Sequence, residues 1–294
     1  MKKIIILLAI AAGLAAAVSC TSAQAQKPVP WSVINTDSYK SSILKETVKF
    51  NIYLPAGFDP SSAEKYPVIY LLHGLTDTYD AWATKGHMKN VVDELMASGE
   101  CRRAIIVMPN AGHPDCRKVL NGYFNQPGRA YEDFFFQEFL PFVEEKYNIA
   151  GDKAHRAIMG LSMGGGGSTV YSQRHPDMFS SCYSMSGWLD EPEPGEDEPR
   201  DMLYQERLSV HEHSAIAYLE NADDATLEQL RSVKWFFDCG DDDFLLDVNL
   251  KMHQLMRDKG VKSELRVRDG WHCWEYWHLA LRLALPFASR NFGE

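Results

Sequence analysis

The stretch Gly160-Leu-Ser-Met-Gly164 constrains this chain more than any other. It matches the G-x-S-x-G nucleophile elbow, in which a serine occupies a sharp turn between a strand and a helix. Such a turn strains the backbone of the serine, and a Cβ two residues before or after it would collide with the turn. The geometry lifts the Ser162 hydroxyl clear of the sheet. It also aims the Met163 N–H, at a helix N-terminus, toward a developing oxyanion.

Three other interpretations compete for this glycine-rich stretch. A phosphate-binding P-loop requires Lys after its last glycine, whereas the run Gly164–Gly167 leads into Ser168 and Thr169. A flexible linker would not follow the apolar run 156–160. The third interpretation is a glycine-rich turn whose serine has no chemical role, and the pentapeptide by itself does not exclude it. The rest of the chain must decide between that turn and a nucleophile.

The amino terminus has the pattern of an export signal. Lys2-Lys3 is a positive segment, residues 4–18 are an apolar run, and Ala23-Gln-Ala25 is a small-x-small cleavage site. The apolar run is shorter than the roughly 20 residues that a membrane-spanning helix needs. The segment 17–20 also resembles a bacterial lipobox. We favour cleavage after Ala25 and a soluble exported protein, with lipidation of Cys20 as the alternative tether to a membrane.

Charge and cysteine content exclude several kinds of partner. Removing residues 1–25 takes away two lysines and no acid, so the formal charge of −10 becomes −12. A surface of this sign argues against nucleic acid and anionic membranes as partners. The cysteines show no C-x-x-C spacing that would suggest zinc. We expect Cys182 and Cys239 to be buried in strands, while Cys101 and Cys116 are a candidate disulfide.

Strand-like and helical segments alternate along the rest of the chain. We expect strands at 41–54, 66–72, 104–108, 156–160, 180–187, 234–240 and 264–268. We expect helices at 88–98, 130–147, 169–174, 248–259 and 274–289, and helix-compatible sequence after the acidic loop up to Leu230. This alternation predicts an α/β fold with a mostly parallel sheet covered by helices on both faces. We expect a single domain at 28–294, with an acidic, proline-rich insertion at about 188–232.

A nucleophilic serine needs a base and an acid that orients the base. Asp241-Asp-Asp243 follows one late strand and His272 follows the next, at the carboxyl ends where such folds place their active sites. His272 is therefore the best base, whereas the residues alone do not separate the three aspartates. His73 is a rival, but its place before Gly74 fits a loop-forming role.

The site also requires a second donor to the oxyanion, and the histidines must be considered as metal ligands. The loop His73-Gly74-Leu75 follows the first buried strand, and Gly74 lets the backbone turn sharply enough to present the Leu75 N–H. His211 and His213 are two residues apart on an expected helix, so their rings point to opposite sides and a metal site there is not expected. We therefore expect no metal and no cofactor.

These landmarks together resemble the "putative esterase", or esterase D-like, family of α/β-hydrolases. The matching stretches are Tyr66–Gly74, Gly160–Gly165, Asp238–Leu245 and Gly270–Trp274, and they span nearly all of the mature chain. The family includes feruloyl esterases, acetyl-xylan esterases, S-formylglutathione hydrolases and mycolyltransferases. By this resemblance the C-G-x-x-D-F pattern makes Asp243 the triad acid, and the G-x-H-x-W pattern makes His272 the base. The extra aspartates at 241 and 242 depart from the family pattern.

We therefore expect an exported serine esterase that forms an acyl-enzyme on Ser162. The resemblance favours removal of feruloyl or acetyl groups from plant polysaccharide or oligosaccharide, since export argues against a cytosolic glutathione adduct as substrate. A general short-chain esterase and a glycan-binding protein without turnover are the alternatives. Aromatic residues in or near loops are candidates for contacting the substrate, each with a place in the core as its alternative: Trp82, Tyr123, Phe124, Trp188, Trp271 and Trp274. The insertion is expected to cover the cleft.

Overall fold

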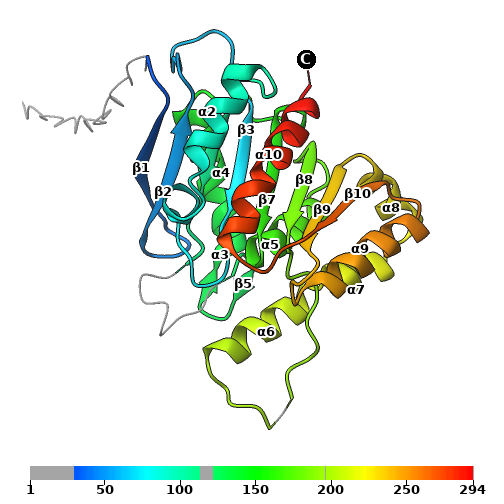
Figure 1. Ribbon diagram of the computed structural model, residues 1–294. Helices are drawn as coiled ribbons and strands as arrows, with labels where there is room; N and C mark the ends of the chain where they lie inside the picture. Colours follow the sequence, from blue (N-terminus) through cyan, green and yellow to red (C-terminus); the bar gives the residue numbers. More distant parts are fainter. Residues whose placement is uncertain (1–29, 113–121, 196, 294) are drawn as a thin grey trace, which may run out of the picture.

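An eight-stranded, mostly parallel sheet forms the centre of the protein. The computed structural model describes residues 30–112, 122–195 and 197–293 (Figure 1). The strands lie in the order β1-β2-β4-β3-β7-β8-β9-β10. Seven of them run in the same direction, and β2 runs in the opposite direction. They are β1 (Val33–Lys40), β2 (Thr47–Leu54), β3 (Val68–Leu72), β4 (Ile105–Met108), β7 (Arg156–Leu161), β8 (Ser181–Met185), β9 (Lys234–Gly240) and β10 (Ser263–Arg268). The predicted α/β architecture is thus confirmed.

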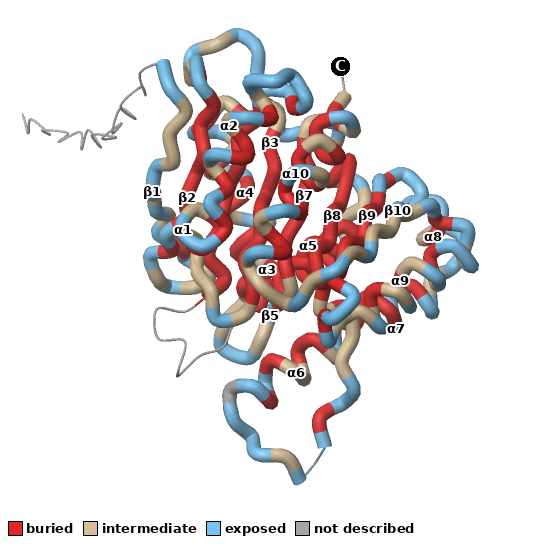
Figure 2. The backbone as a smooth tube through the Cα atoms, in the orientation of Figure 1, coloured by how far each residue is buried: buried red, intermediate tan, exposed pale blue. Residues whose placement is uncertain are grey.

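Helices cover both faces of this sheet. They are α1 (Ala81–Thr84), α2 (Met88–Ser98), α3 (Tyr131–Phe134), α4 (Leu140–Lys146), α5 (Met163–Arg174), α6 (Met202–Glu212), α7 (Ala215–Glu220), α8 (Asp224–Arg231), α9 (Leu246–Asp258) and α10 (Trp274–Arg290). Figure 2 shows the central strands buried along most of their length. A separate two-stranded ribbon joins β5 (Asn125–Gln126) to β6 (Arg129–Ala130).

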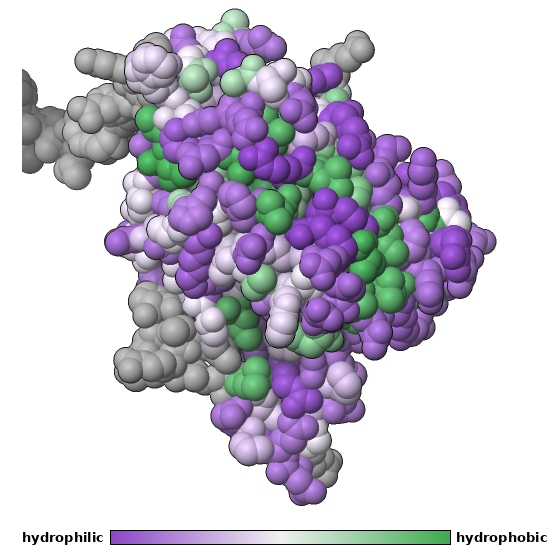
Figure 3. Space-filling view, viewed as in Figure 1, coloured by the Kyte–Doolittle hydropathy of each residue, from purple (hydrophilic) through white to green (hydrophobic). Residues whose placement is uncertain are grey.

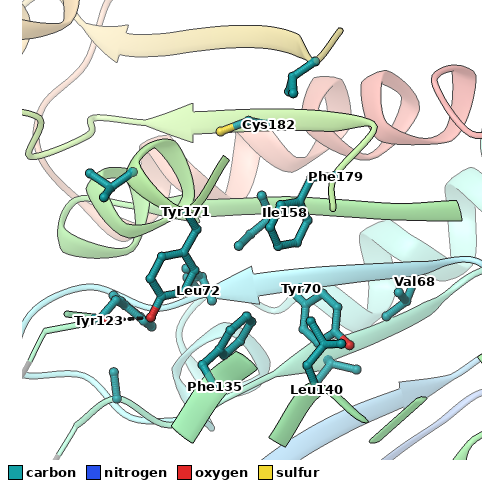
Figure 4. Packing of buried hydrophobic residues seen from close by; sticks show 14 of the residues in the cluster. Val68, Tyr70, Leu72, Tyr123, Phe135, Leu140, Ile158, Tyr171, Phe179 and Cys182 are labelled. Carbon is teal, nitrogen blue, oxygen red and sulfur yellow. Dashed lines mark hydrogen bonds between the residues drawn. The ribbon is translucent and has the colours of Figure 1, made fainter. Parts of the chain in front are cut away.

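Two hydrophobic cores lie on opposite faces of the sheet. Side chains alternate between the faces of a strand, so Tyr70 and Leu72 of β3 enter one core while Ile69 and Leu71 enter the other. The first core includes residues of α4, α5 and α9, and Figure 4 shows part of its packing. The second includes residues of α2 and α10. Burial of β3 on both faces explains its uninterrupted apolar sequence.

The sequence prediction was wrong at two places in the first half of the chain. The expected strand at 41–54 begins only at Thr47, and the preceding strand β1 was missed because it is a polar edge strand with no buried residue. The expected helix at 130–147 is interrupted by a π-helical turn, Phe135–Phe139. The bulky phenylalanines in this turn pack against Phe50 and Tyr70. Packing of these side chains against the sheet therefore accounts for the departure of this segment from the regular α-helix expected from its sequence.

The structure describes three of the cysteines for which the sequence made a prediction. Cys182 and Cys239 are buried, as expected. Cys101, one half of the candidate disulfide, is instead a buried free thiol. Cys116, like the predicted export signal and Cys20, lies outside the described residues. Within the described ranges no helix is both long and apolar enough to cross a membrane.

The predicted insertion forms helices α6, α7 and α8. The segment leaves the sheet after β8, and the loop before α6 protrudes from the body of the protein, at the bottom of Figure 1, whereas one face of α6 is buried. Figure 3 shows that hydrophilic residues cover most of this protruding part. Arg207 of α6 holds the preceding loop, because its guanidinium forms ion pairs with Glu191 and Glu198. The acidic run is thus partly neutralised by a cation from the insertion itself.

Candidate active site

Ser162 occupies the turn between β7 and α5 that the motif predicts. Its φ of 53° and ψ of −118° lie in a region that residues with a side chain rarely adopt. A Cβ added to Gly160 would lie 2.5 Å from the Gly164 carbonyl oxygen, and one added to Gly164 would lie 2.5 Å from the His73 carbonyl oxygen. Both outer glycines of the motif are therefore required by backbone contact, as expected.

Ser162, His272 and Asp243 form one hydrogen-bonded chain. The Ser162 Oγ lies 2.9 Å from His272 Nε2. On the other side of the ring, His272 Nδ1 lies 3.0 Å and 2.9 Å from the two carboxylate oxygens of Asp243. Asp243 follows β9 and His272 follows β10, so the neighbouring parallel strands bring the two loops together.

The structure separates the three aspartates that sequence reasoning left open. Asp243 is buried, whereas Asp241 and Asp242 are exposed. Asp241 instead accepts a hydrogen bond of 3.0 Å from the Gly270 N–H, which ties the acid loop to the histidine loop. The geometry therefore favours Asp243 as the partner of His272, which is the residue that the family resemblance selects.

Asp243 is held as a carboxylate. Burial raises its pKa, but hydrogen bonds from His272, the Leu245 N–H and Ser186 lower it, and the net pKa is below the ordinary value. The Leu245 N–H donates to Asp243 Oδ1 at 2.9 Å. Hydrogen bonds to the charged form favour ionisation. A negative charge thus lies against the Nδ1 side of the imidazole.

Two aromatic rings flank the imidazole, and sequence reasoning missed both. The ring centroid of Phe244 lies 4.5 Å from that of His272, and Trp277 meets His272 at 4.8 Å in an edge-to-face arrangement. Trp277 is buried and donates from its indole to Ser186 Oγ, while Phe244 is 77% exposed. The phenylalanine of the C-G-x-x-D-F pattern was the available signal for Phe244.

The expected oxyanion donors lie on the two segments that adjoin the serine. Met163 is the first residue of α5, and N–H groups in a first helical turn have no acceptor within the helix. A Cβ added to Gly74 would lie 3.6 Å from the Ser162 Cβ, so the loop leading to Leu75 runs beside the serine. These positions are compatible with an oxyanion hole formed by the N–H groups of Leu75 and Met163.

His73 has the loop-forming role expected of it. The ring is buried, with Nδ1 2.8 Å from the Gly74 carbonyl oxygen, and its Nε2 accepts from the Ala111 N–H at 3.0 Å. Burial lowers the pKa of His73, which suits the neutral ring that such an acceptor requires. Its carbonyl accepts from the Tyr123 hydroxyl at 2.9 Å. His73 is thus part of the scaffold of the oxyanion loop.

Three of the aromatic residues expected to contact substrate are buried instead. Trp82 and Tyr123 are each 1% exposed, and the Trp82 indole donates to the Leu72 carbonyl at 2.9 Å. Phe124 is also buried, stacked on His213 at 4.5 Å. These residues belong to the core, because their bulk and polar groups are already engaged by the protein. The structure therefore corrects the expectation for all three.

The other three aromatic candidates retain accessible surface. Trp188 is half-buried; its backbone N–H donates to the Ser162 carbonyl at 3.0 Å, and its indole N–H donates to Glu191 at 2.9 Å. Trp274 is half-buried against Trp82, with ring centroids 5.1 Å apart. Trp271, next to the base His272, is 69% exposed. These three remain candidates for substrate contact.

Among the described residues, one group of side chains has the spacing of metal ligands. Asp241, Asp242 and Asp269 offer carboxylate oxygens within 4.8 Å of one another. All three residues are exposed, and exposed acidic groups commonly lie together without an ion. His211 and His213 do not form a pair: His211 Nδ1 contacts the Glu191 carbonyl, and His213 stacks on Phe124.

The chain is similar to known esterases. A family model described as "Putative esterase" matches residues 41–288. The "Endo-1,4-beta-xylanase/feruloyl esterase" of Xylanibacter ruminicola is 31% identical over 157 residues, which are 52% of this chain and 21% of that protein. "Endo-1,4-beta-xylanase Y" of Acetivibrio thermocellus is 31% identical over 166 residues, or 49% of this chain and 14% of that protein. The match thus spans about a fifth or less of these relatives.

Solved structures match over most of the chain. A structure of a ferulic acid esterase superposes with a TM-score of 0.85 at 50% sequence identity, covering 90% of this chain and 99% of that chain. A ferulic acid esterase from Anaeromyces mucronatus in complex with ferulic acid has a TM-score of 0.70 at 20% identity, covering 90% and 94% of the two chains. At that lower identity the likeness shows the fold alone.

Proposed function

The chain belongs to the family described as "Putative esterase", and from that premise we propose that it is a serine esterase that removes feruloyl groups from plant polysaccharide. The observation that carries the proposal is the hydrogen-bonded chain from Ser162 Oγ through His272 to Asp243. A binding module has no need of a strained serine aligned with a base. Turnover therefore explains the site better than glycan binding alone.

The proposed reaction begins with attack by Ser162 on the ester carbonyl. His272 Nε2 takes the hydroxyl proton as the bond from Oγ to the carbonyl carbon forms. Asp243 accepts from Nδ1–H, which keeps Nε2 free as the acceptor and stabilises the imidazolium. The N–H groups of Leu75 and Met163 bind the carbonyl oxygen as it becomes negative.

The second half of the proposed reaction regenerates the serine. The tetrahedral intermediate collapses, and the sugar hydroxyl leaves with the proton held by His272. Water then attacks the acyl-enzyme with His272 again as the base, and the released carboxylic acid leaves Ser162 with its proton restored. No step needs a metal or a cofactor, because charge in each intermediate is balanced by residues of this chain.

Similarity to ferulic acid esterases supports the feruloyl substrate. The 50% identity spans 90% of the chain. Trp271 is exposed and lies in the base loop directly before His272, and half-buried Trp188 donates its backbone N–H to the Ser162 carbonyl. Both offer apolar surface on which a phenolic ring would stack. The export signal supports an encounter with polysaccharide outside the cytosol, with the product of cleavage after Ala25 favoured over lipidated Cys20.

A panel of esters tests the proposal. The purified protein would be incubated with a feruloylated arabino-oligosaccharide, an acetylated xylo-oligosaccharide and 4-nitrophenyl acetate, and products identified by chromatography. We expect ferulate release with the highest kcat/KM, and no release above background by Ser162→Ala. Preferred release of acetate would replace the feruloyl assignment with an acetyl one, and absence of any hydrolysis would refute the proposed activity.

A further inference from the structure

The insertion helix α6 docks on the body of the protein through a face that contains a buried carboxyl. Residues at the helical spacing i, i+3, i+4 and i+7 form this face: Glu206, Ser209, Val210 and His213. Glu206 is 0% exposed, Ser209 3% and Val210 1%. Helix faces that pack on a protein core are normally apolar. An acidic residue at the centre of this one therefore requires an explanation.

The Glu206 carboxyl lies beside the nucleophile elbow. Its Oε2 accepts a hydrogen bond of 2.7 Å from Gln126 Nε2. A Cβ added to Gly122 would lie 2.2 Å from Glu206 Oε1 and 2.1 Å from the terminal methyl of Met163. The Glu206 carboxyl and the Met163 methyl therefore lie together in the space that a side chain at residue 122 would fill. Helix α6 reaches the elbow through this contact.

No cation in the described part of the chain compensates the Glu206 carboxyl. The groups that contact it are uncharged, and Oε1 has no hydrogen bond of good geometry. The charged and titratable side chains of the surrounding elements are engaged elsewhere: Arg129 with Glu46, Arg207 with Glu191 and Glu198, Arg200 with Tyr204, and His213 with Phe124. Burial raises the pKa of Glu206 to about 7, although hydrogen bonds from Gln126 and Gly122 counter it.

We propose that Glu206 is a positioning residue whose buried carboxyl holds α6 against Gly122 and Met163, and that docked α6 favours bulky esters over small ones. The inference rests on the proposed esterase activity of the same site. Glu206 does not touch the reacting atoms. It acts through the loop 122–126 and the Met163 side chain on the oxyanion donor. Docked α6 also positions Trp188, a candidate for contact with a large ester, because Arg207 of α6 pairs with Glu191 and the Trp188 indole donates to Glu191 at 2.9 Å.

The direction of the pH dependence follows from the two states of the helix. In undocked α6 the carboxyl is in water with its ordinary pKa of 4.5, whereas in docked α6 it titrates near 7. Below pH 4.5 both states hold the proton and docking is strongest. Between pH 4.5 and pH 7 the Glu206 carboxyl loses its proton only in the undocked state. The equilibrium constant for docking therefore falls by up to about tenfold per pH unit. Above 7 the weakened docking no longer changes.

The ratio of two specificity constants isolates this effect. We would measure kcat/KM for a feruloylated arabino-oligosaccharide and for 4-nitrophenyl acetate from pH 5 to pH 8, because the ratio cancels the pH dependence of the chemical steps that both reactions share. We expect the ratio to fall about tenfold or more toward pH 7.5 in the wild-type protein. Glu206→Gln, which mimics the neutral carboxyl, should keep a high and pH-independent ratio.

The control variant is Glu212→Gln, on the exposed side of the same helix, which should retain the wild-type slope. Hydrogen exchange of the α6 amides, corrected for intrinsic rates, is a second readout that needs no substrate. Protection should fall between pH 5.5 and pH 7.5 in the wild type and stay constant in Glu206→Gln. Equal loss of protection in both proteins would overturn the inference. Absence of ester hydrolysis would refute the proposed function while leaving the exchange experiment valid.

Discussion

Replacing Asp243 with asparagine is expected to abolish efficient turnover because the structure dictates which way the new amide must point. Oδ1 of Asp243 accepts from the Leu245 N–H at 2.9 Å. The amide oxygen of the introduced asparagine must occupy that position, since an NH₂ group would oppose the donor there. The NH₂ group then lies at the Oδ2 position, which is 2.9 Å from His272 Nδ1. A donor at that place repels an Nδ1–H and favours the tautomer in which Nδ1 accepts, in competition with the oxygen at the Oδ1 position, 3.0 Å from Nδ1.

The magnitude follows from the histidine tautomer. If Nδ1 accepts, the proton lies on Nε2, and Nε2 can no longer accept the proton of Ser162. The corresponding change in a serine protease lowers kcat by about 10⁴-fold, which is a barrier increase of about 5 kcal/mol at 1.36 kcal/mol per tenfold change in rate. We expect a similar loss for Asp243→Asn in the hydrolysis of 4-nitrophenyl acetate at neutral pH. Far-ultraviolet circular dichroism should show a folded protein.

The matched control is Asp242→Asn, because Asp242 is adjacent and exposed. We expect its kcat to stay within about twofold of the wild-type value, as for most surface substitutions. The reasoning is refuted if Asp243→Asn retains a tenth of wild-type activity. It is also refuted if Asp242→Asn proves the more damaging change.

Two further predictions concern the aromatic residues. Trp82→Ala should lower the free energy of unfolding by about 3–5 kcal/mol, because it leaves a cavity in the core and removes the indole that donates to the Leu72 carbonyl. Chemical denaturation measures this loss, and a value below about 1 kcal/mol would contradict the placement of Trp82 in the core. Trp271→Ala should leave stability within about 0.5 kcal/mol, since the side chain is 69% exposed. The KM of Trp271→Ala should rise for the feruloyl ester and not for 4-nitrophenyl acetate. Equal effects on the two esters would show that Trp271 does not contact the feruloyl group.

Much of the fold follows from local sequence patterns. The apolar strands β3, β4, β7 and β9 were predicted because burial on both faces leaves continuous hydrophobic runs. The elbow was predictable because backbone contacts at Gly160 and Gly164 allow no Cβ. The order of serine, acid and histidine loops then placed the rest of the site on one edge of the sheet. These features depend on neighbours close in the chain or on strand order.

Features set by tertiary contact were not predictable. Trp82 and Trp271 are equally aromatic and equally near loops, yet α2, α10 and β3 surround the first and solvent surrounds the second. Edge strand β1 carries too few apolar residues to reveal itself. Glu206 looks in the sequence like one more acid of a charged insertion. Only the approach of Gly122 and Met163 from distant parts of the chain makes it a buried group.

Labelling of the nucleophile tests the central claim most directly. The protein would be treated with a fluorophosphonate ester, which reacts with activated serines, and the modified peptide identified by mass spectrometry. We predict one adduct, on Ser162, that is absent from Ser162→Ala and strongly reduced in Asp243→Asn. An adduct on another serine, or none on a folded wild-type protein, would contradict the account of Ser162 as the nucleophile.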